Sequence, residues 1–135
     1  MRKLKFRAWD RYAKKMCDVY TIDFPTGHLF TDIGDSHLGA EVEALMQSTG
    51  LHDKNGVEIF EGDILSNSFM DDAPNTKSWV VWRDGAWRLK NRKVKGDRTL
   101  YDNLGWCSIR EPRYGGVEVI GNIYETPELL EDENV

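Results

Sequence analysis

The chain has 135 residues, with 40% hydrophobic and 30% charged residues, a formal net charge of −5 and a pI of about 5.2. This balance excludes a disordered chain, and the length fits one core with a small appended element. No stretch approaches the roughly 20 apolar residues that cross a bilayer, and no apolar segment follows the basic start, so we expect a cytoplasmic protein without membrane contact.

The first predicted element is a β-hairpin. Residues 3–9 alternate apolar and basic side chains with the period of two that strands have, and residues 16–22 include several β-favouring types. The polar stretch between them, residues 10–15, supplies the turn. Residues 23–39 contain Pro25 and three glycines around a short apolar insert, so we expect a long loop or a weak pair of strands there.

The centre of the chain is predicted to form strands separated by tight turns. Residues 40–47 have a composition that suits a helix, but their apolar residues keep a period of two, and Ser48-Thr49-Gly50 continues straight into a turn-rich stretch, so we predict a strand. Asp53–Gly56 is typical of a tight hairpin turn, because Asn and Gly tolerate positive φ. Asp63 follows Gly62 at the start of the next strand, where we expect its carboxylate to accept backbone N–H groups.

A second hairpin is predicted in the tryptophan-rich part of the chain. Trp79–Trp82 and Trp87–Leu89 are β-favouring segments on either side of an Asp-Gly turn. The polar stretch 90–98 that follows is expected to be a mobile connection.

The end of the chain is predicted to be a strand and a short helical turn. Residues 117–124 read as a strand, with a bulge or a close backbone approach at Gly121. Thr126 and Pro127 have the residue types of a helix N-cap and first helical position, so a turn is expected through Leu130 with a frayed end after it. Short strands with so little helix indicate a sandwich or a small barrel rather than an alternating α/β fold.

Three segments of the chain carry a family resemblance. They read KFRAWD at Lys5–Asp10, LMQSTGLHDKNGVEIFEGDIL at Leu45–Leu65 and VIGNIYETPELL at Val119–Leu130. Together they resemble the YopX family of bacteriophage and prophage proteins. The resemblance implies a β-rich N-terminal element followed by an SH3-like barrel. It implies no established activity and no catalytic residues, and residues 66–116 match no motif.

From this resemblance and the strand pattern we predict a mainly β protein. Residues 1–40 are expected to form a hairpin-led extension with a loop, and residues 41–135 an SH3-like barrel with a short C-terminal helical turn.

The sequence predicts no enzyme, metal site or cofactor. His28, His37 and His52 lack the i, i+4 spacing of a helical metal pair. Cys17 and Cys107 form neither a redox pair nor a zinc framework, so two reduced thiols are expected. No nucleophile motif, phosphate-binding loop or dinucleotide fingerprint is present.

Two segments are strongly basic within this acidic chain. Residues 1–15 contain seven Lys or Arg against one Asp, and residues 83–98 contain seven against two. The second segment supplies candidate contacts with a partner or a nucleic acid at Arg83, Arg88, Lys90, Arg92, Lys93, Lys95 and Arg98. The first supplies candidate assembly contacts at Lys3, Lys5 and Arg7.

The charge segregation favours recognition over chemistry. Complementary potentials steer protein association, so we expect a non-enzymatic interaction or self-assembly module, with a second copy or another phage or host protein as partner. The alternative is a single-stranded nucleic-acid-binding protein that uses the basic hairpin at residues 79–98, because cations track phosphates while Trp79, Trp82 and Trp87 stack on bases. The acidic pI of about 5.2 weighs against this alternative.

Overall fold

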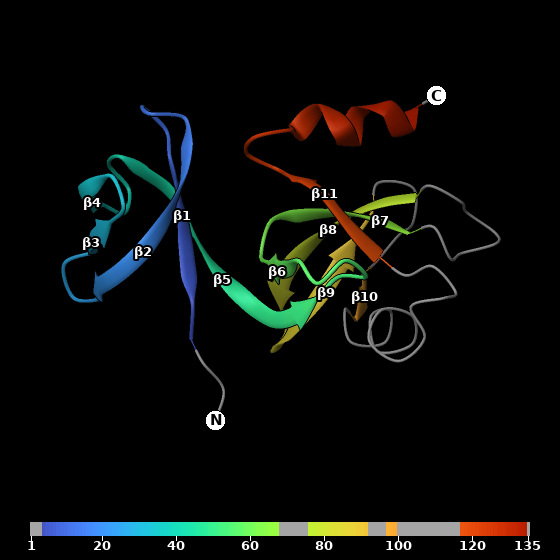
Figure 1. Ribbon diagram of the computed structural model, residues 1–135, viewed down its shortest axis with the longest axis horizontal. Coiled ribbons are helices and arrows are strands. Elements are labelled where there is room, and N and C mark those ends of the chain that lie inside the picture. Colours follow the sequence, from blue (N-terminus) through green and yellow to red (C-terminus); the bar gives the residue numbers. More distant parts are fainter. Residues whose placement is uncertain (1–3, 68–75, 92–96, 100–116, 135) are drawn as a thin grey trace. The chain divides into compact units, whose positions relative to one another are not determined.

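The computed structural model describes residues 4–67, 76–91, 97–99 and 117–134 (Figure 1). These residues form a mainly β fold with two antiparallel sheets, which confirms the predicted class. The chain divides into two compact units, Met1–Ser48 and Thr49–Val135, and the division falls within one long strand, β5 (Val42–His52). No helix in the described part of the chain is long and apolar enough to span a bilayer.

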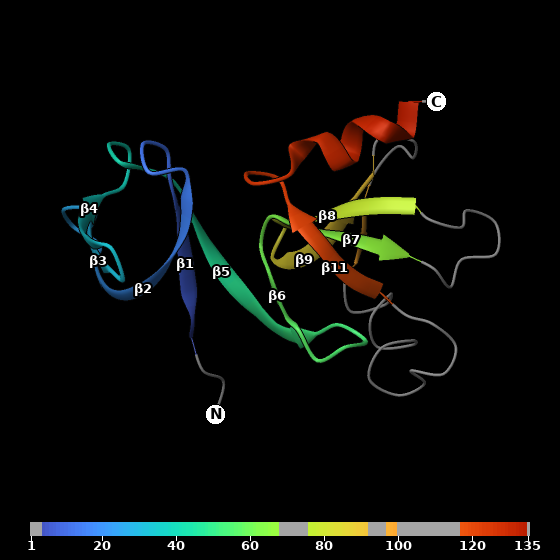
Figure 2. The same cartoon turned by 45° about the horizontal axis from the view of Figure 1, so that its top comes forward.

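The N-terminal unit contains four strands and the first part of β5. Along the chain these strands are β1 (Phe6–Asp10), β2 (Lys15–Asp23), β3 (His28–Thr31) and β4 (Gly34–His37). They lie in the order β4-β3-β2-β1-β5, and β6 (Glu58–Phe60) follows β5 in the same sheet (Figure 2). The pairing of Asp10 with Lys15 confirms the first predicted hairpin. Strands β3 and β4 are the weak strand pair, one of the two expectations for residues 23–39.

The core of the N-terminal unit is small. Its core cluster contains the buried side chains of Ala8, Leu29 and Val42, and the side chains packed against them are Val19, Ile22 and Leu45. Burial of a Val or Leu side chain contributes roughly 1.5–3 kcal/mol, so this set is enough to fix one face of the sheet. Because strand residues alternate between faces, the neighbouring positions on β2, β3 and β4 point outward.

The C-terminal unit is built on a five-stranded sheet in the order β10-β9-β8-β7-β11. Its strands are β7 (Asp63–Asn67), β8 (Thr76–Arg83), β9 (Ala86–Lys90), β10 (Asp97–Thr99) and β11 (Val117–Asn122). The pairing of Trp82 with Trp87 confirms the second predicted hairpin. The 3-10 helix η2 (Pro127–Asn134) packs against β8. The core of this unit consists of Ile59, Leu65, Val80, Leu89 and Val117.

The described residues do not close into a barrel. They form the two sheets given above, with β6 hydrogen-bonded to β5. The SH3-like barrel expected for residues 41–135 therefore stays a prediction, as does the division at residue 41.

The strand predicted at residues 40–47 is confirmed as part of β5, which extends beyond it through residues 48–50. The strand continues because partners remain available on both sides. The Ser48 N–H donates to the Lys5 carbonyl at 2.8 Å, and the Thr49 hydroxyl donates to the Ile59 carbonyl at 2.7 Å. Tertiary pairing therefore overrides the turn preference of Ser, Thr and Gly at this point.

Two boundaries in the C-terminal unit also differ from the prediction. Asp97 and Arg98, expected in a connection, begin β10 by pairing with Lys90 and Leu89. Helix η2 begins at Pro127 as predicted but continues to Asn134, beyond the expected end at Leu130.

Gly121 occupies a position where only glycine fits. The register of β11 against β7 shifts between Val119 and Gly121, which confirms the predicted irregularity. A Cβ atom here would overlap the Thr126 side chain and approach Leu129 to 2.9 Å. The Thr126 hydroxyl accepts the Asn122 N–H at 3.1 Å, so the chain folds back tightly over the end of β11.

A buried carboxylate joins the central turn to the last strand. Asp53 is 5% exposed, and its Oδ1 accepts the N–H groups of Asn55 and Val57, both at 2.8 Å. Its Oδ2 accepts the Val119 N–H of β11 at 2.9 Å. The Gly56 N–H donates to the Asp53 carbonyl at 3.0 Å, which confirms the predicted turn.

Three further buried polar side chains bind backbone N–H groups. Asp63 Oδ2 accepts the Phe60 N–H at 2.8 Å, which confirms its predicted role. Asp10 Oδ1 and Asn122 Oδ1 each accept the N–H groups of the residues two and three positions later, at 2.8 to 3.0 Å. Each of these side chains fixes the turn beside it.

A side chain occupies one position at the outer edge of β4. Glu41 Oε2 accepts the His37 N–H at 3.0 Å, and the His37 carbonyl accepts the Ala40 N–H at 3.1 Å. The N–H of Glu41 itself, followed by that of His37, lowers the pKa of the Glu41 carboxyl below its ordinary value. Unpaired strand edges attract other strands, and these bonds occupy the edge groups of His37.

We expect Asp53→Ala to lower the free energy of unfolding by about 3 kcal/mol, because three N–H groups lose a charged acceptor. Asp53→Asn retains one acceptor oxygen and should give an intermediate loss. Urea unfolding followed by tryptophan fluorescence measures both. The exposed Glu43 of β5 is the control, and Glu43→Ala should change stability by less than about 0.5 kcal/mol. Equal effects of Asp53→Ala and Glu43→Ala would show that the buried carboxylate does not stabilise the fold.

We expect Glu41→Ala to increase hydrogen exchange at the His37 amide several-fold, because that N–H loses its acceptor. Glu43→Ala removes the same charge two residues away and should leave this amide unchanged. Amide exchange followed by NMR measures both variants. Unchanged exchange in Glu41→Ala would mean that the edge is protected in another way.

Candidate interaction face

One face of the N-terminal sheet presents rings and carboxylates to solvent. The register places Phe30 opposite Thr21 and Asp35, and it places His28 opposite Asp23 and His37. The residues between them on β3 and β4 are buried on the other face. We define the β2–β4 outer face as the residues Tyr20, Asp23, His28, Phe30, Asp35 and His37.

Two exposed aromatic rings contact each other on this face. Tyr20 is 63% exposed and Phe30 is 48% exposed, and their ring centroids lie 6.3 Å apart. The register between β2 and β3 shifts between Val19 and Thr21, so Tyr20 occupies a bulge beside Phe30. Aromatic side chains of this kind supply much of the binding energy in protein interfaces.

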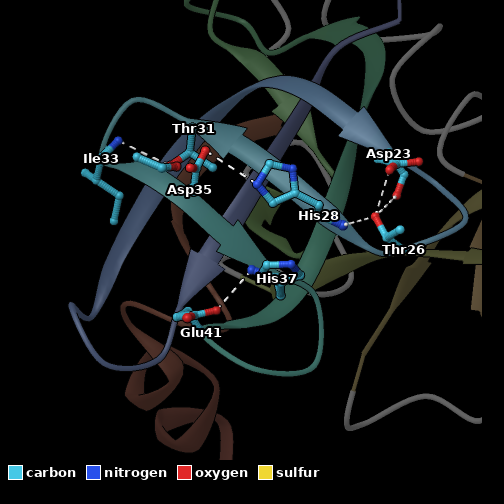
Figure 3. Close-up of polar contacts among 9 residues, drawn as sticks. Asp23, Thr26, His28, Thr31, Ile33, Asp35, His37 and Glu41 are labelled. Atoms are coloured by element: carbon cyan, nitrogen blue, oxygen red, sulfur yellow. Dashed lines mark hydrogen bonds and ion pairs between the residues drawn. The ribbon is translucent and has the colours of Figure 1, made fainter.

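Two histidine rings form a second pair on the same face (Figure 3). His28 and His37 are register partners, and their ring centroids lie 5.0 Å apart. His28 Nε2 lies 3.4 Å from Asp35 Oδ1. The Thr26 hydroxyl donates to Asp23 Oδ2 at 2.9 Å and accepts the His28 N–H at 3.2 Å. The adjacent turn therefore holds one end of the face in place.

Exposed apolar side chains concentrate in the N-terminal unit. Among the described residues, seven of the nine large hydrophobic side chains that are exposed belong to it: Leu4, Tyr12, Tyr20, Phe24, Phe30, Ile33 and Leu38. Phe24 lies in the turn between β2 and β3, and Ile33 lies in the turn between β3 and β4. Of these, Tyr20 and Phe30 contact each other, and clustered exposed apolar side chains mark interaction sites.

The segment that forms this face is acidic. Residues 16–48 contain six Asp or Glu and no Lys or Arg. The Asp35 side chain is 69% exposed. Asp32, in the turn between β3 and β4, lies 3.8 Å from Lys15 of β2. The β2–β4 outer face therefore combines exposed rings with negative charge.

The predicted basic contact residues of the second hairpin lie in different structural environments. Arg83 is exposed and lies 3.9 Å from the Asp84 carboxylate, while Arg88 Nε donates to the Arg83 carbonyl at 3.0 Å. Lys90 is exposed, and its register partner is Asp97. Arg98 is instead the register partner of Leu89. Arg92, Lys93 and Lys95 lie outside the described residues.

The tryptophans of this hairpin are divided between core and surface. Trp82 is 52% exposed, and its ring meets that of Trp87 edge-on with centroids 4.7 Å apart. Trp87 packs against the core of the C-terminal unit, and Trp79 is half-buried. Trp82 is thus the exposed tryptophan among the three.

The predicted assembly contacts lie at the start of the chain. Lys3 is outside the described residues, and Lys5 is exposed just before β1. Arg7 lies within β1, half-buried, with Asp18 and Met46 as register partners. Both Lys5 and Arg7 make interactions within the chain.

No group of three or more His, Cys, Asp or Glu in the described part of the chain could hold a metal ion. Cys17 is a free, buried thiol whose pKa is raised by burial and by nearby carboxylates, Asp32 first. Cys107 lies outside the described residues. A buried, protonated thiol is a poor nucleophile.

The β2–β4 outer face was not predicted from the sequence. The pattern that could have indicated it is the alternation in two short segments joined by Asp32-Ile33, His28-Leu29-Phe30-Thr31 and Gly34-Asp35-Ser36-His37. With only four residues each, such segments lie near the lower limit of strand length. The glycines around them point equally to a loop.

Comparisons with known proteins agree with the three segments that carry the family resemblance. The family model of the YopX protein matches residues 5–131. The crystal structure of protein EF1440 from Enterococcus faecalis is similar, with 31% sequence identity, 96% of this chain and 99% of that chain covered, and a TM-score of 0.64. No curated protein matches the chain. The family match covers nearly the whole chain, and the protein therefore belongs to the YopX family.

Proposed function

We propose that this YopX protein is an accessory protein of a bacteriophage or prophage. In this proposal it is a non-enzymatic module that binds another protein through the β2–β4 outer face. The observation that carries the proposal is the exposed ring pair of Tyr20 and Phe30 within a unit that holds most of the exposed apolar side chains. Soluble proteins rarely leave such side chains clustered in water without a binding role.

The non-enzymatic part of the proposal is supported by the use made of buried carboxylates. Asp10, Asp53 and Asp63 are buried acids of the kind that an enzyme uses for proton transfer. Each of them accepts backbone N–H groups and fixes a turn. These contacts assign them to the fold rather than to a substrate.

Affinity capture tests the proposed binding. The full chain, immobilised and exposed to a lysate of phage-infected bacteria, should retain a protein that the double variant Tyr20→Ser with Phe30→Ser loses. The captured protein, once purified, should bind the double variant roughly tenfold or more weakly in calorimetry, as expected when buried rings are truncated at an interface.

The matched control is Leu4→Ser with Tyr12→Ser. Leu4 is 65% exposed and Tyr12 is 75% exposed, and both lie outside the β2–β4 outer face. Equal capture by both double variants would contradict the proposal. If the captured protein is a second copy of the chain, sedimentation should show a mass that rises with concentration and falls in the Tyr20 and Phe30 variant, and the function would be self-assembly.

The second candidate function is binding of single-stranded nucleic acid by the hairpin of β8 and β9. The exposed Trp82 favours it, because this ring belongs to a hairpin that also carries the exposed Arg83 and Lys90. A stacked base on Trp82 and a phosphate on either cation would match the usual mode of such proteins.

Tryptophan fluorescence tests the nucleic-acid candidate. Titration with oligothymidine at low salt should quench the emission, and the quenching should weaken with added salt. Trp82→Ala should reduce the affinity by roughly tenfold, from the loss of one stacked base. Phe24→Ala, at a ring that is 76% exposed in the other unit, is the control and should bind as the wild type does. No quenching at low salt would remove this candidate.

We also propose that residues 41–135 form the SH3-like barrel implied by the family and that the protein works in the bacterial cytoplasm. The single core and the five-stranded antiparallel sheet of the C-terminal unit support the first proposal.

A further inference from the structure

We infer that the partner segment bound by the β2–β4 outer face is an extended cationic stretch of another protein, with arginine alternating with apolar residues. The inference rests on the proposed function, since it names the chemistry of the partner for the same face. It follows from charge, from the spacing of rings and carboxylates, and from the occupied edge groups of His37.

The negative charge of the face favours a cationic partner. Residues 16–48 contribute six acids and no Lys or Arg, so the one Lys or Arg on β2, β3 and β4 is Lys15 at the start of β2. Lys15 lies 3.8 Å from Asp32 in the turn between β3 and β4, and Asp32 is not part of the face. The Asp35 side chain is 69% exposed, and its contact on the face is the partly exposed His28 ring at 3.4 Å.

The spacing of the groups suits arginine. Phe30 is the cross-strand partner of Asp35, and side chains in such pairs lie about 4.5–5.5 Å apart at their Cβ atoms. A guanidinium stacked on a ring within about 6 Å of its centroid can therefore also donate to the neighbouring carboxylate. The same combination of a ring and an acid recurs where His28 of β3 lies opposite Asp23 of β2. A lysine ammonium offers neither the planar stack nor the paired donors.

One position at the edge of β4 is already occupied. The His37 N–H and carbonyl, which an added strand would need, are bonded to Glu41 and Ala40. A segment lying across the strands can instead place its apolar residues on Tyr20 and Phe30. A nucleic acid would bring phosphates against Asp23 and Asp35, which electrostatic repulsion opposes.

Fluorescence anisotropy with short labelled peptides tests the inference. The probes are an eight-residue peptide that alternates arginine and leucine, and matched peptides with lysine or glutamate in place of arginine. The arginine peptide should bind the wild-type chain most tightly, the lysine peptide more weakly, and the glutamate peptide not measurably. Binding of the arginine peptide should weaken with salt, as for any exposed ion pair.

Substitutions locate the binding. Tyr20→Ala with Phe30→Ala should lower the affinity for the arginine peptide roughly tenfold or more. Asp35→Asn should lower this affinity about twofold to fivefold, the range of an exposed ion pair. Controls with the same chemical change away from the face are Tyr12→Ala and Glu128→Gln, both at exposed residues, and both should bind as the wild type does. Because Tyr20, Phe30 and Asp35 are exposed, their substitution should leave the fold intact, which circular dichroism checks.

The inference would be overturned by equal affinity for the arginine and glutamate peptides, or by binding that the control variants weaken as much as the face variants do. These results are separable from failure of the proposed function. A captured protein whose retention depends on Tyr20 and Phe30, but which docks through an acidic segment, would retain the interaction role and reject the cationic partner. Equal capture by the wild type and by the Tyr20 and Phe30 variant would reject the interaction role itself.

Discussion

The C-terminal unit depends on the buried carboxylate of Asp53. A carboxylate is costly to bury unless hydrogen bonds replace its water, and Asp53 receives three backbone N–H groups. Two of these come from its own turn, and the third comes from Val119, which is 66 residues away in the sequence. The turn thus covers the outer edge of β11, where the Lys54 N–H also reaches the Val117 carbonyl at 3.1 Å. One side chain shapes a loop and protects a strand edge.

The two units use their apolar residues differently. The C-terminal unit gathers side chains from β6 to β11 into one core, and Trp87, Leu51 and Val119 extend it. The N-terminal unit buries a smaller set behind β2 and β3 and leaves Tyr20 and Phe30 in solvent. A short sheet can cover only one of its faces with its own side chains, so the other face is left for water or a partner.

Much of the fold is predictable from the sequence where local chemistry is decisive. The hairpin around Asp84-Gly85, the turn at Asp53–Gly56 and the irregularity at Gly121 each rest on residues with few conformational alternatives. The extension of β5 through residues 48–50 was not predicted, because its hydrogen bonds involve residues distant in the sequence. The same reason hides the β2–β4 outer face, since the pairing of His28 with His37 and of Phe30 with Asp35 depends on the register of β3 against β4. Basic runs are visible in a sequence, whereas a cross-strand surface is not.

Strand β5 belongs to both units. It contributes its first part to one unit and its last part to the other, with no linker between them. Val42–Gln47 pair with β1, whereas the Thr49 hydroxyl donates to the Ile59 carbonyl of β6. A ligand that stabilises the N-terminal unit would, by mass action, reduce the population in which the first part of the strand is released from β1. Amide protection along Val42–Gln47 would therefore report occupancy of that unit.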